Sequence, residues 1–250
     1  MNSLLINTQN GVTTLTLNRV ERHNAFDAEL VTAIDRELIK YADDNTTRIL
    51  VIKANGKFFC AGGDLTWFKS KTNNVSDSTQ LAQMLKHLYE FPKPTIAVAQ
   101  GSAFGGGVGL LACCDLVVAD ENANFCLSEV KLGLVPATIS PYIVQAVGKR
   151  QANYLALTAE QITAEHAQTM GLVQLVVETS LLESTTHNII EKLLRNGPDA
   201  MRMTKQLLQE LAPLPENYLE KTAHILASVR ASEEAQEGIQ AFLDKRAAQW

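Results

Sequence analysis

Cysteine is scarce in this sequence: it supplies four of the 250 residues, and no two of them form a CxxC pair. Each lies in an apolar stretch, which favours buried, reduced thiols in the cytoplasm over disulfide bridges. No Ser–His–Asp arrangement is evident, and no spacing of histidine, cysteine and acidic residues is typical of a metal site. The sequence therefore predicts neither a disulfide scaffold nor a metal centre. The four cysteines are Cys60, Cys113, Cys114 and Cys126.

Long hydrophobic runs are also missing. No apolar run approaches the roughly 20 residues that a membrane span needs, and the N-terminal MNSLLINTQNG lacks a basic flank followed by an apolar core. The chain has no excess of basic residues either, because its formal net charge is −5. We therefore expect a cytoplasmic protein with neither a membrane nor a nucleic-acid partner.

What is present is ordinary globular composition, 46% hydrophobic and 20% charged. A chain of this length buries roughly three quarters of its unfolded surface without any staple. Alternating segments around Asn10-Gly11 predict a β-hairpin, and Asp27 is a candidate N-cap for the helix that follows. The remaining polar stretch, residues 69–79, is rich in Ser and Asn and predicts a mobile surface segment. The spacing predicts strands at 3–8, 12–18, 48–54, 95–99 and 116–119, and helices at 26–41, 81–89 and up to 114.

A strand-then-helix unit recurs up to about residue 177, which predicts an α/β architecture with parallel strands. After residue 181 the pattern is helical almost to the end. We therefore expect a core over residues 1–190 and a helical region over residues 191–250.

Four of the five positions from Gly105 to Gly109 are glycine, in the stretch AFGGGVGLLACCD. The stretch matches neither the GxxxxGK[ST] phosphate loop nor the GxGxxG dinucleotide fingerprint, which leaves close helix packing or a backbone site. The first amides of a helix have no intrahelical partner, and glycine lets a ligand approach them closely. An oxyanion hole needs two such donors. The stretch FFCAGGDL offers the second, because Gly62 and Gly63 follow another strand.

The paired motifs CAGGD and AFGGGVGLLACCDLVVAD resemble those of the crotonase, or enoyl-CoA hydratase/isomerase, superfamily. The segments LTLNRVERHNAF, FCLSEVKLGLVPA and AFLDKRAAQW agree, so the resemblance covers essentially the whole chain. It implies a spiral core of ββα units and C-terminal helices that pack into a homotrimer or a dimer of trimers. It also implies acyl-CoA thioesters as substrates, with coenzyme A as part of the substrate and no other cofactor.

The resemblance also implies roles for individual residues. The amides of Gly63 and Gly106 would hold the thioester oxygen. Asp64 has a second interpretation from the residues themselves, as the cap of a short helix. A departure is Val20, where the superfamily commonly has proline. Contacts with the substrate or its CoA would come from Arg22, Ala25, Ala61 (through its carbonyl), Gly62, Asp64, Leu65, Gly109, Phe242 and Lys245, the last two often reaching a neighbouring subunit's CoA.

Hydratases of the superfamily commonly use two glutamates. Here one of those positions holds Gly109, and the other holds Glu129. Glu129 could be a solvated residue paired with Lys131. Its neighbours are Phe125, Leu127 and other apolar residues, however, so we expect partial desolvation and a raised pKa. Glu129 is therefore the candidate acid/base group.

A single carboxylate fits three hypotheses: a hydratase, a 3-enoyl-CoA to 2-enoyl-CoA isomerase, and a non-catalytic acyl-CoA-binding member. The segments GGDLTWF and LSEVKLGLVPATISPYIVQAVG narrow the resemblance to the methylglutaconyl-CoA and carboxygeranoyl-CoA hydratase group of leucine and acyclic-terpene catabolism. Their substrates are branched and carry a distal carboxylate. Gly109 would then leave room where a glutamate would crowd and repel that acid.

Overall fold

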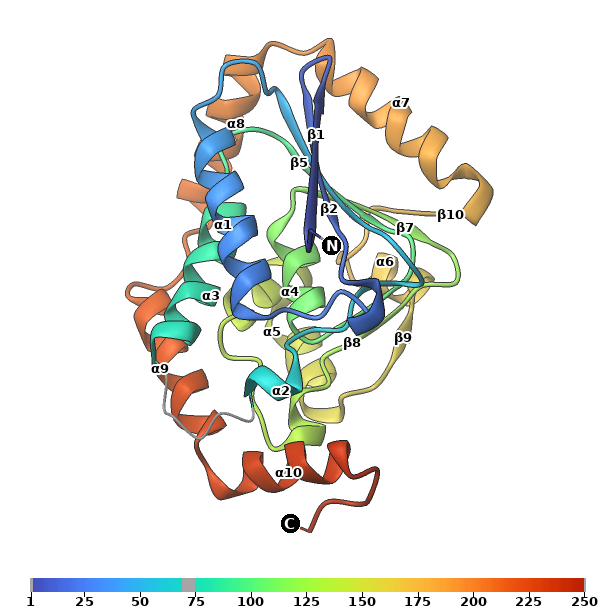
Figure 1. Ribbon diagram of the computed structural model, residues 1–250. Helices are drawn as coiled ribbons and strands as arrows, with labels where there is room; N and C mark the ends of the chain where they lie inside the picture. The colour runs from blue at the N-terminus through green and yellow to red at the C-terminus, as the bar shows by residue number, and fades with distance from the viewer. Residues whose placement is uncertain (1, 69–74, 250) are drawn as a thin grey trace.

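The computed structural model describes residues 2–68 and 75–249 and arranges them around two sheets (Figure 1). The larger sheet has the strand order β1-β2-β3-β5-β7-β10. The expected hairpin is present: β1 and β2 pair antiparallel, and every later pair in this sheet is parallel. The strands are β1 (Leu4–Gln9), β2 (Val12–Leu17), β3 (Ile49–Ala54), β5 (Thr95–Ala99), β7 (Leu116–Asp120) and β10 (Leu175–Val177).

The smaller sheet has the order β4-β6-β8-β9. Consecutive strands alternate between the two sheets: β3, β5 and β7 lie in the larger one, and β4, β6 and β8 follow them into the smaller one. A helix follows each pair, so the chain winds as the expected spiral of ββα units. The strands of the smaller sheet are β4 (Phe58–Cys60), β6 (Ser102–Phe104), β8 (Asn124–Cys126) and β9 (Ile162–Thr163).

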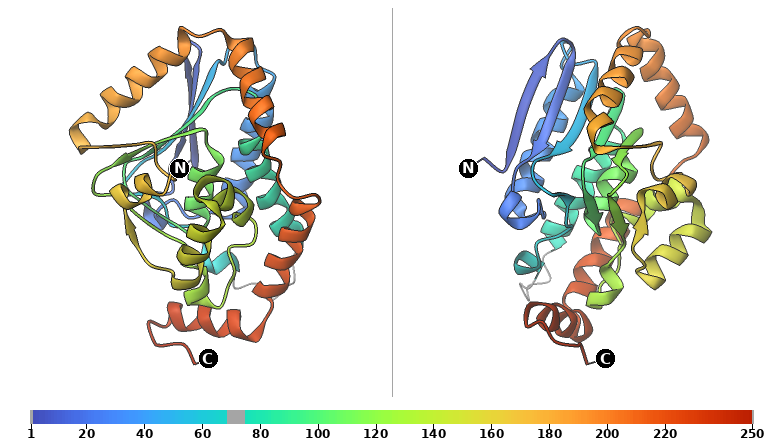
Figure 2. Two further views of the ribbon diagram at one scale, coloured as in Figure 1. Left: turned by 180° about the vertical axis from the view of Figure 1, so that it is seen from behind. Right: turned by 90° about the vertical axis from the view of Figure 1, so that its right-hand side faces the viewer.

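Both faces of the central strands of the larger sheet are covered, which explains why β3, β5 and β7 are largely apolar and buried. Along β3, Leu50 and Ile52 point into the main core, whereas Ile49 and Val51 pack on the other face against α7 (Leu182–Leu194). The main core lies under α1 (Ala28–Ala42), α3 (Val75–Tyr89) and α4 (Gly106–Cys113). Figures 1 and 2 show α7 on the opposite side of the sheet from α1 and α3.

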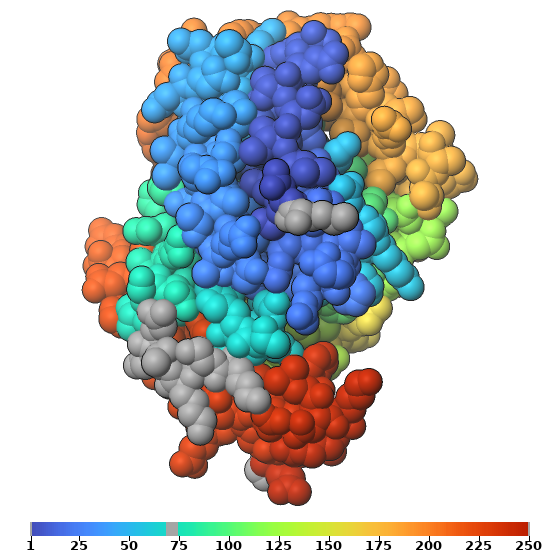
Figure 3. All heavy atoms as spheres, viewed as in Figure 1, coloured from blue at the N-terminus to red at the C-terminus, as the bar shows by residue number. Residues whose placement is uncertain are grey.

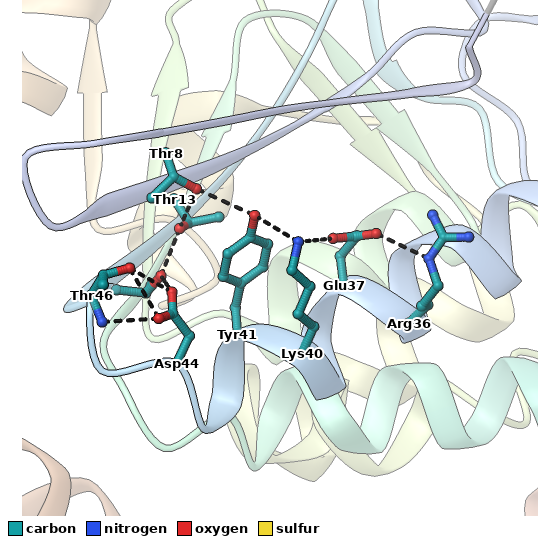
Figure 4. Close-up of polar contacts among 9 residues, drawn as sticks. Thr8, Thr13, Arg36, Glu37, Lys40, Tyr41, Asp44 and Thr46 are labelled. Atoms are coloured by element: carbon teal, nitrogen blue, oxygen red, sulfur yellow. Dashed lines mark hydrogen bonds and ion pairs between the residues drawn. The ribbon is translucent and has the colours of Figure 1, made fainter.

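The start of α1 forms as expected, since the backbone N–H of Leu30 donates to the Asp27 carboxylate over 2.8 Å. At its other end, a polar network ties the helix to the β1–β2 hairpin (Figure 4). Within it, Thr8 contacts both Thr13 and the hydroxyl of Tyr41. The network anchors the edge of the sheet to the helix layer.

The segment expected to be mobile, residues 69–79, requires a correction. Residues 69–74 lie outside the described part of the chain, but residues 75–79 form the first turns of α3. Ser78, Leu81 and Leu85 are buried along one face, at helical spacing. The polar composition concealed this start, because only one side of the turn contacts the core.

The helices after residue 181 extend from the top of the sheet to the lower end of the molecule. Helix α9 packs along α3, and α10 packs against the 3-10 helix η2 (Glu129–Leu132). In Figure 3 the red C-terminal residues form that lower end. The expected boundary at residue 190 falls inside α7, whose Ile189 and Ile190 pack on the sheet. The other helices are α2 (Leu65–Phe68), α5 (Ser140–Thr158), α6 (Ala164–Thr169), α8 (Pro198–Leu211), α9 (Tyr218–Arg230) and α10 (Glu233–Leu243), with 3-10 turns η1 (Val20–Arg22) and η3 (Thr179–Leu181).

All four cysteines are free thiols, three of them buried and Cys114 partly so. Within residues 2–68 and 75–249, no helix has the length and apolar character to span a membrane. The same residues contain no cluster of three or more His, Cys, Asp or Glu side chains suited to hold a metal ion.

Candidate active site

The two glycine turns lie against each other because the strands that precede them are neighbours. Strands β4 and β6 pair in parallel, so their carboxyl ends meet at one edge of the smaller sheet. Gly62, at φ +89°, follows β4, and a Cβ atom placed on it would lie 2.9 Å from the Phe104 carbonyl oxygen and 3.4 Å from the Gly106 nitrogen. Glycine is therefore required there both by the turn and by the close approach of the second turn.

The amides of Gly63 and Gly106 remain available at this junction. Gly106 opens α4, and Gly105 before it has φ +49°. Within the described residues, neither the Gly63 nor the Gly106 amide donates a hydrogen bond to another protein group. The start of α4 also carries the positive end of the helix dipole. Two amides at touching turns can therefore stabilise one oxygen atom that gains negative charge.

The carboxylate of Glu129 lies beside the second turn. A Cβ atom placed on Gly105 would be 3.1 Å from Glu129 Oε1. The residue opens η2, which the left-handed Gly133 ends. Its Oε2 atom is enclosed and has no hydrogen-bond partner among the described residues. The alternative of a pair with Lys131 does not form in the structure, because no ion pair joins the two side chains.

Burial raises the pKa of Glu129 to about 7, against a smaller opposing effect of its own backbone N–H. The expectation of a desolvated carboxyl with a raised pKa is thus confirmed. A carboxyl group that titrates near neutral pH exchanges protons readily in both directions.

These groups open into one cavity of about 560 Å³. Part of its lining is apolar and includes Phe68, Leu81, Leu134 and Leu226. Among the described lining residues Glu129 is the single acid. Of the residues singled out from sequence, the cavity is lined by Ala61, Gly62, Gly63, Leu65, Gly106, Glu129 and Phe242.

Phe242 lies on α10 of the same chain, 61% exposed, so within one subunit it already borders the cavity. Lys245 follows α10 at φ +54° and is exposed. Arg22 is exposed as well, next to His23, whose ring packs on the cavity residue Phe58 with centroids 4.5 Å apart. The first loop therefore adjoins the cavity opening without Arg22 lining it.

Ala25 and Asp64, two further residues singled out from sequence, do not line the cavity. The Ala25 carbonyl accepts from Arg19, which also contacts the Asp64 carboxylate. The other Asp64 oxygen accepts from the backbone N–H of Thr66 over 3.0 Å and from its hydroxyl over 2.6 Å. Asp64 thus caps α2, as its second interpretation predicted, and is not part of the described cavity lining.

The interpretation of Gly109 as an open space is wrong. A Cβ atom placed there would lie 2.2 Å from Ile139 Cγ2, and Gly109 is absent from the described lining. Ile139, 2% exposed, fills the volume into which a side chain at position 109 would project. The glycine makes room for a neighbouring side chain of the protein itself.

Ile139 and Phe68 are site residues that sequence reasoning missed. A Cβ atom on Gly63 would be 2.4 Å from the Phe68 ring, so this ring packs directly on the first turn. Both residues look like ordinary core positions in the sequence, since nothing local marks them.

A sequence model of the family described as "Enoyl-CoA hydratase/isomerase" matches residues 7–250. The 2,3-dehydroadipyl-CoA hydratase of Escherichia coli is 35% identical over 248 residues, which cover 98% of this chain and 97% of that protein. The mevalonyl-coenzyme A hydratase sidH of Aspergillus fumigatus is 34% identical over 242 residues, covering 94% and 90%.

Solved structures agree with these relatives. An enoyl-CoA hydratase from Shewanella pealeana superposes with a TM-score of 0.81 at 40% identity, covering 100% of this chain and 96% of that one. The match extends over both sheets and the C-terminal helices, since it leaves no part of this chain uncovered.

Proposed function

This chain belongs to the enoyl-CoA hydratase/isomerase family, and from that premise we propose that it adds water to a branched 2-enoyl-CoA that carries a distal carboxylate, and removes water in the reverse direction. The observation that carries the chemistry is Glu129: a buried carboxyl with an unpartnered oxygen, beside two glycine turns with available amides.

The amides of Gly63 and Gly106 act on the thioester carbonyl. As negative charge moves onto its oxygen, both N–H groups donate to it. Each such donor contributes roughly 3 kcal/mol to the transition state. The thioester sulfur leads the CoA portion outward past Ala61, toward the loop that holds Arg22.

Glu129 carries out both proton transfers. Its carboxylate takes a proton from water as the water oxygen bonds to Cβ, and the π electrons shift through Cα onto the thioester oxygen. The same carboxyl then returns its proton to Cα as the carbonyl re-forms. One water is consumed, both new bonds form on one face of the alkene, and Glu129 ends ionised as it began.

The absence of a second acid from the described cavity lining supports an anionic acyl group. Two like charges about 5 Å apart at an effective dielectric near 20 repel by roughly 3 kcal/mol. Position 109 holds glycine packed under Ile139, so this repulsion does not arise there. A relative named 2,3-dehydroadipyl-CoA hydratase has a dicarboxylic acyl group in its name.

The second candidate is isomerisation, in which Glu129 carries one proton between Cγ and Cα. The single carboxylate favours it equally, because that reaction needs no second acid. Turnover separates the two: a hydratase removes the absorbance of the conjugated enoyl thioester, whereas an isomerase creates it from a 3-enoyl-CoA.

The test is a turnover panel of methylglutaconyl-CoA, crotonyl-CoA and 3-enoyl-CoAs, read by that absorbance. We expect loss of absorbance with methylglutaconyl-CoA and a lower kcat/KM for crotonyl-CoA. Binding without turnover of any of them would contradict catalysis. A preference for crotonyl-CoA would contradict the carboxylated substrate.

We further propose a cytoplasmic trimer or dimer of trimers. Helix α8 has no buried residue, and four of its apolar side chains are 54% to 72% exposed. The family resemblance suggests that a second copy of this chain covers these exposed apolar side chains. Light scattering at micromolar concentration tests it, and a monomer mass would contradict it. The four side chains are Met203, Leu207, Leu208 and Leu211.

A further inference from the structure

Arg230 is a buried cation that forms no ion pair with a carboxylate among the described residues. The residue is 4% exposed, and its Nε atom has no hydrogen-bond partner among the described residues. Its Nη2 group donates a hydrogen bond to the Trp67 carbonyl oxygen over 3.0 Å. Asp77 is the acid whose charge acts on Arg230, and one of its carboxylate oxygens accepts from the Trp67 indole over 3.1 Å. A buried charge left in this way costs free energy, and binding an anion would recover it.

Arg230 adjoins the cavity through one aromatic residue of its lining, Phe68. It lies one helical turn after Leu226, which lines the cavity, so the two side chains share a face of α9. Its guanidinium carbon lies 4.4 Å from the centroid of the Phe68 ring. Phe68 lines the cavity and packs on Gly63. The guanidinium therefore packs directly on the ring of a residue that lines the cavity.

The two cations that line the cavity, Lys131 and Arg246, are less suited to a buried anion. Arg246 is held by both carboxylate oxygens of Glu237, at 2.7 and 2.8 Å. Lys131 is exposed. Unlike these two side chains, Arg230 combines burial with an Nε donor that no described group uses. Its planar guanidinium can also donate two parallel hydrogen bonds to one carboxylate.

We propose that Arg230 is the specificity residue of this site and pairs with the distal carboxylate of the acyl group, which reaches the guanidinium when the Phe68 ring turns aside. This inference rests on the proposed carboxylated substrate. In the empty site the ring face partly satisfies the cation, and the bound carboxylate replaces that weaker cation–π contact. The pairing sets the depth at which the acyl chain stops, and so the position of its double bond beside Glu129.

The experiment compares two substrates that differ only at the distal group. Methylglutaconyl-CoA carries the carboxylate, and 3-methylpent-2-enoyl-CoA carries a methyl group in its place. We measure kcat/KM for both with wild type, Arg230→Met and Arg230→Lys, with Arg150→Met as a matched control on the exposed part of α5. Near-ultraviolet circular dichroism and thermal unfolding establish that each variant is folded.

We expect Arg230→Met to lower kcat/KM for methylglutaconyl-CoA by roughly 100-fold and to change that for the methyl analogue by less than about threefold. Arg230→Lys keeps the charge but loses the planar guanidinium, so we expect it to lower kcat/KM for methylglutaconyl-CoA by roughly tenfold. Arg150→Met leaves both values unchanged. Should Arg230→Met not fold, the Lys variant carries the same comparison.

Equal losses on both substrates, or no loss on either, would overturn the role of Arg230 and leave the proposed function standing. A wild-type enzyme that prefers the methyl analogue would overturn the carboxylated substrate itself. Failure of the Arg230 role is thus read from the variants, and failure of the proposed function is read from the wild-type enzyme.

Discussion

Two glutamates show how differently this molecule treats the same side chain. Glu37, 5% exposed on α1, has its carboxylate between Arg36 Nε at 3.0 Å and Lys40 Nζ at 3.4 Å (Figure 4). Glu129 has an enclosed oxygen with no described partner, and burial raises its pKa to about 7. The first arrangement keeps a carboxylate charged and fixed. The second leaves it ready to take and return a proton.

Two arginines repeat the contrast. Arg19 lies between two carboxylates, 2.7 Å from Asp27 and 3.3 Å from Asp64, and so ties the start of α1 to the first glycine turn. Arg230 has no such partner and meets aromatic rings instead. Arg19 is thus satisfied within the chain, whereas the Glu129 and Arg230 side chains each keep an enclosed polar atom without a described partner. The difference distinguishes structure from function where residue type does not.

The strongest way to break this comparison is to neutralise each glutamate. Glu129→Gln should lower kcat by at least about 100-fold, because the amide cannot carry the proton, while thioester binding stays nearly intact. Glu37→Gln is the control and should change kcat by less than about twofold. Steady-state kinetics on 2-enoyl-CoAs measure both. Near-normal kcat in Glu129→Gln would remove this residue from the mechanism.

The arginines allow the matching test of stability. Arg19→Met should lower the free energy of unfolding by about 3 kcal/mol, since Asp27 and Asp64 lose their partly buried partner. Arg230→Met leaves no carboxylate unpaired and should change it by less than about 1 kcal/mol. Urea unfolding curves measure the two values. Similar losses would mean that the aromatic contacts of Arg230 hold the fold as firmly as the ion pairs of Arg19.

A glutamate can also be added where the family places a second one. Gly109→Glu should cost about 2 kcal/mol of stability and roughly tenfold in kcat/KM on every substrate, because the new side chain meets Ile139. Adding Ile139→Ala in the same chain should recover most of the stability and favour crotonyl-CoA over methylglutaconyl-CoA. If Gly109→Glu alone were as stable as wild type, Ile139 would not be the obstacle.

The smallest expected effect is a pH profile. Glu129 must be ionised to accept the proton of water, so kcat/KM for hydration should rise with a midpoint near pH 7 and lie about tenfold below its plateau at pH 6. Its pKa is higher folded than unfolded, so its contribution to stability is full below about pH 4.5 and is lost as the pH rises through 7. Glu129→Gln should therefore gain relative stability above pH 7. A midpoint near 4.5 would mean a solvated carboxyl.

Local patterns predicted much of the fold. The hairpin around Asn10-Gly11, the Asp27 cap and the apolar strands each depend on neighbours in sequence, and each was confirmed. The start of α3 was missed, because its polar turns meet the core through one face. The raised pKa of Glu129 was foreseen from its apolar neighbours, which lie within a few residues of it along the chain.

The sequence by itself determined which residues could do chemistry: two glycine turns at strand ends and one glutamate among apolar neighbours. Tertiary structure alone decided which groups are partnered. The pairing of β4 with β6 brings the turns together, Ile139 closes the space at Gly109 thirty residues away, and α9 brings Arg230 to Phe68. Burial and pairing depend on atoms that meet across long stretches of chain, and no local pattern encodes those meetings.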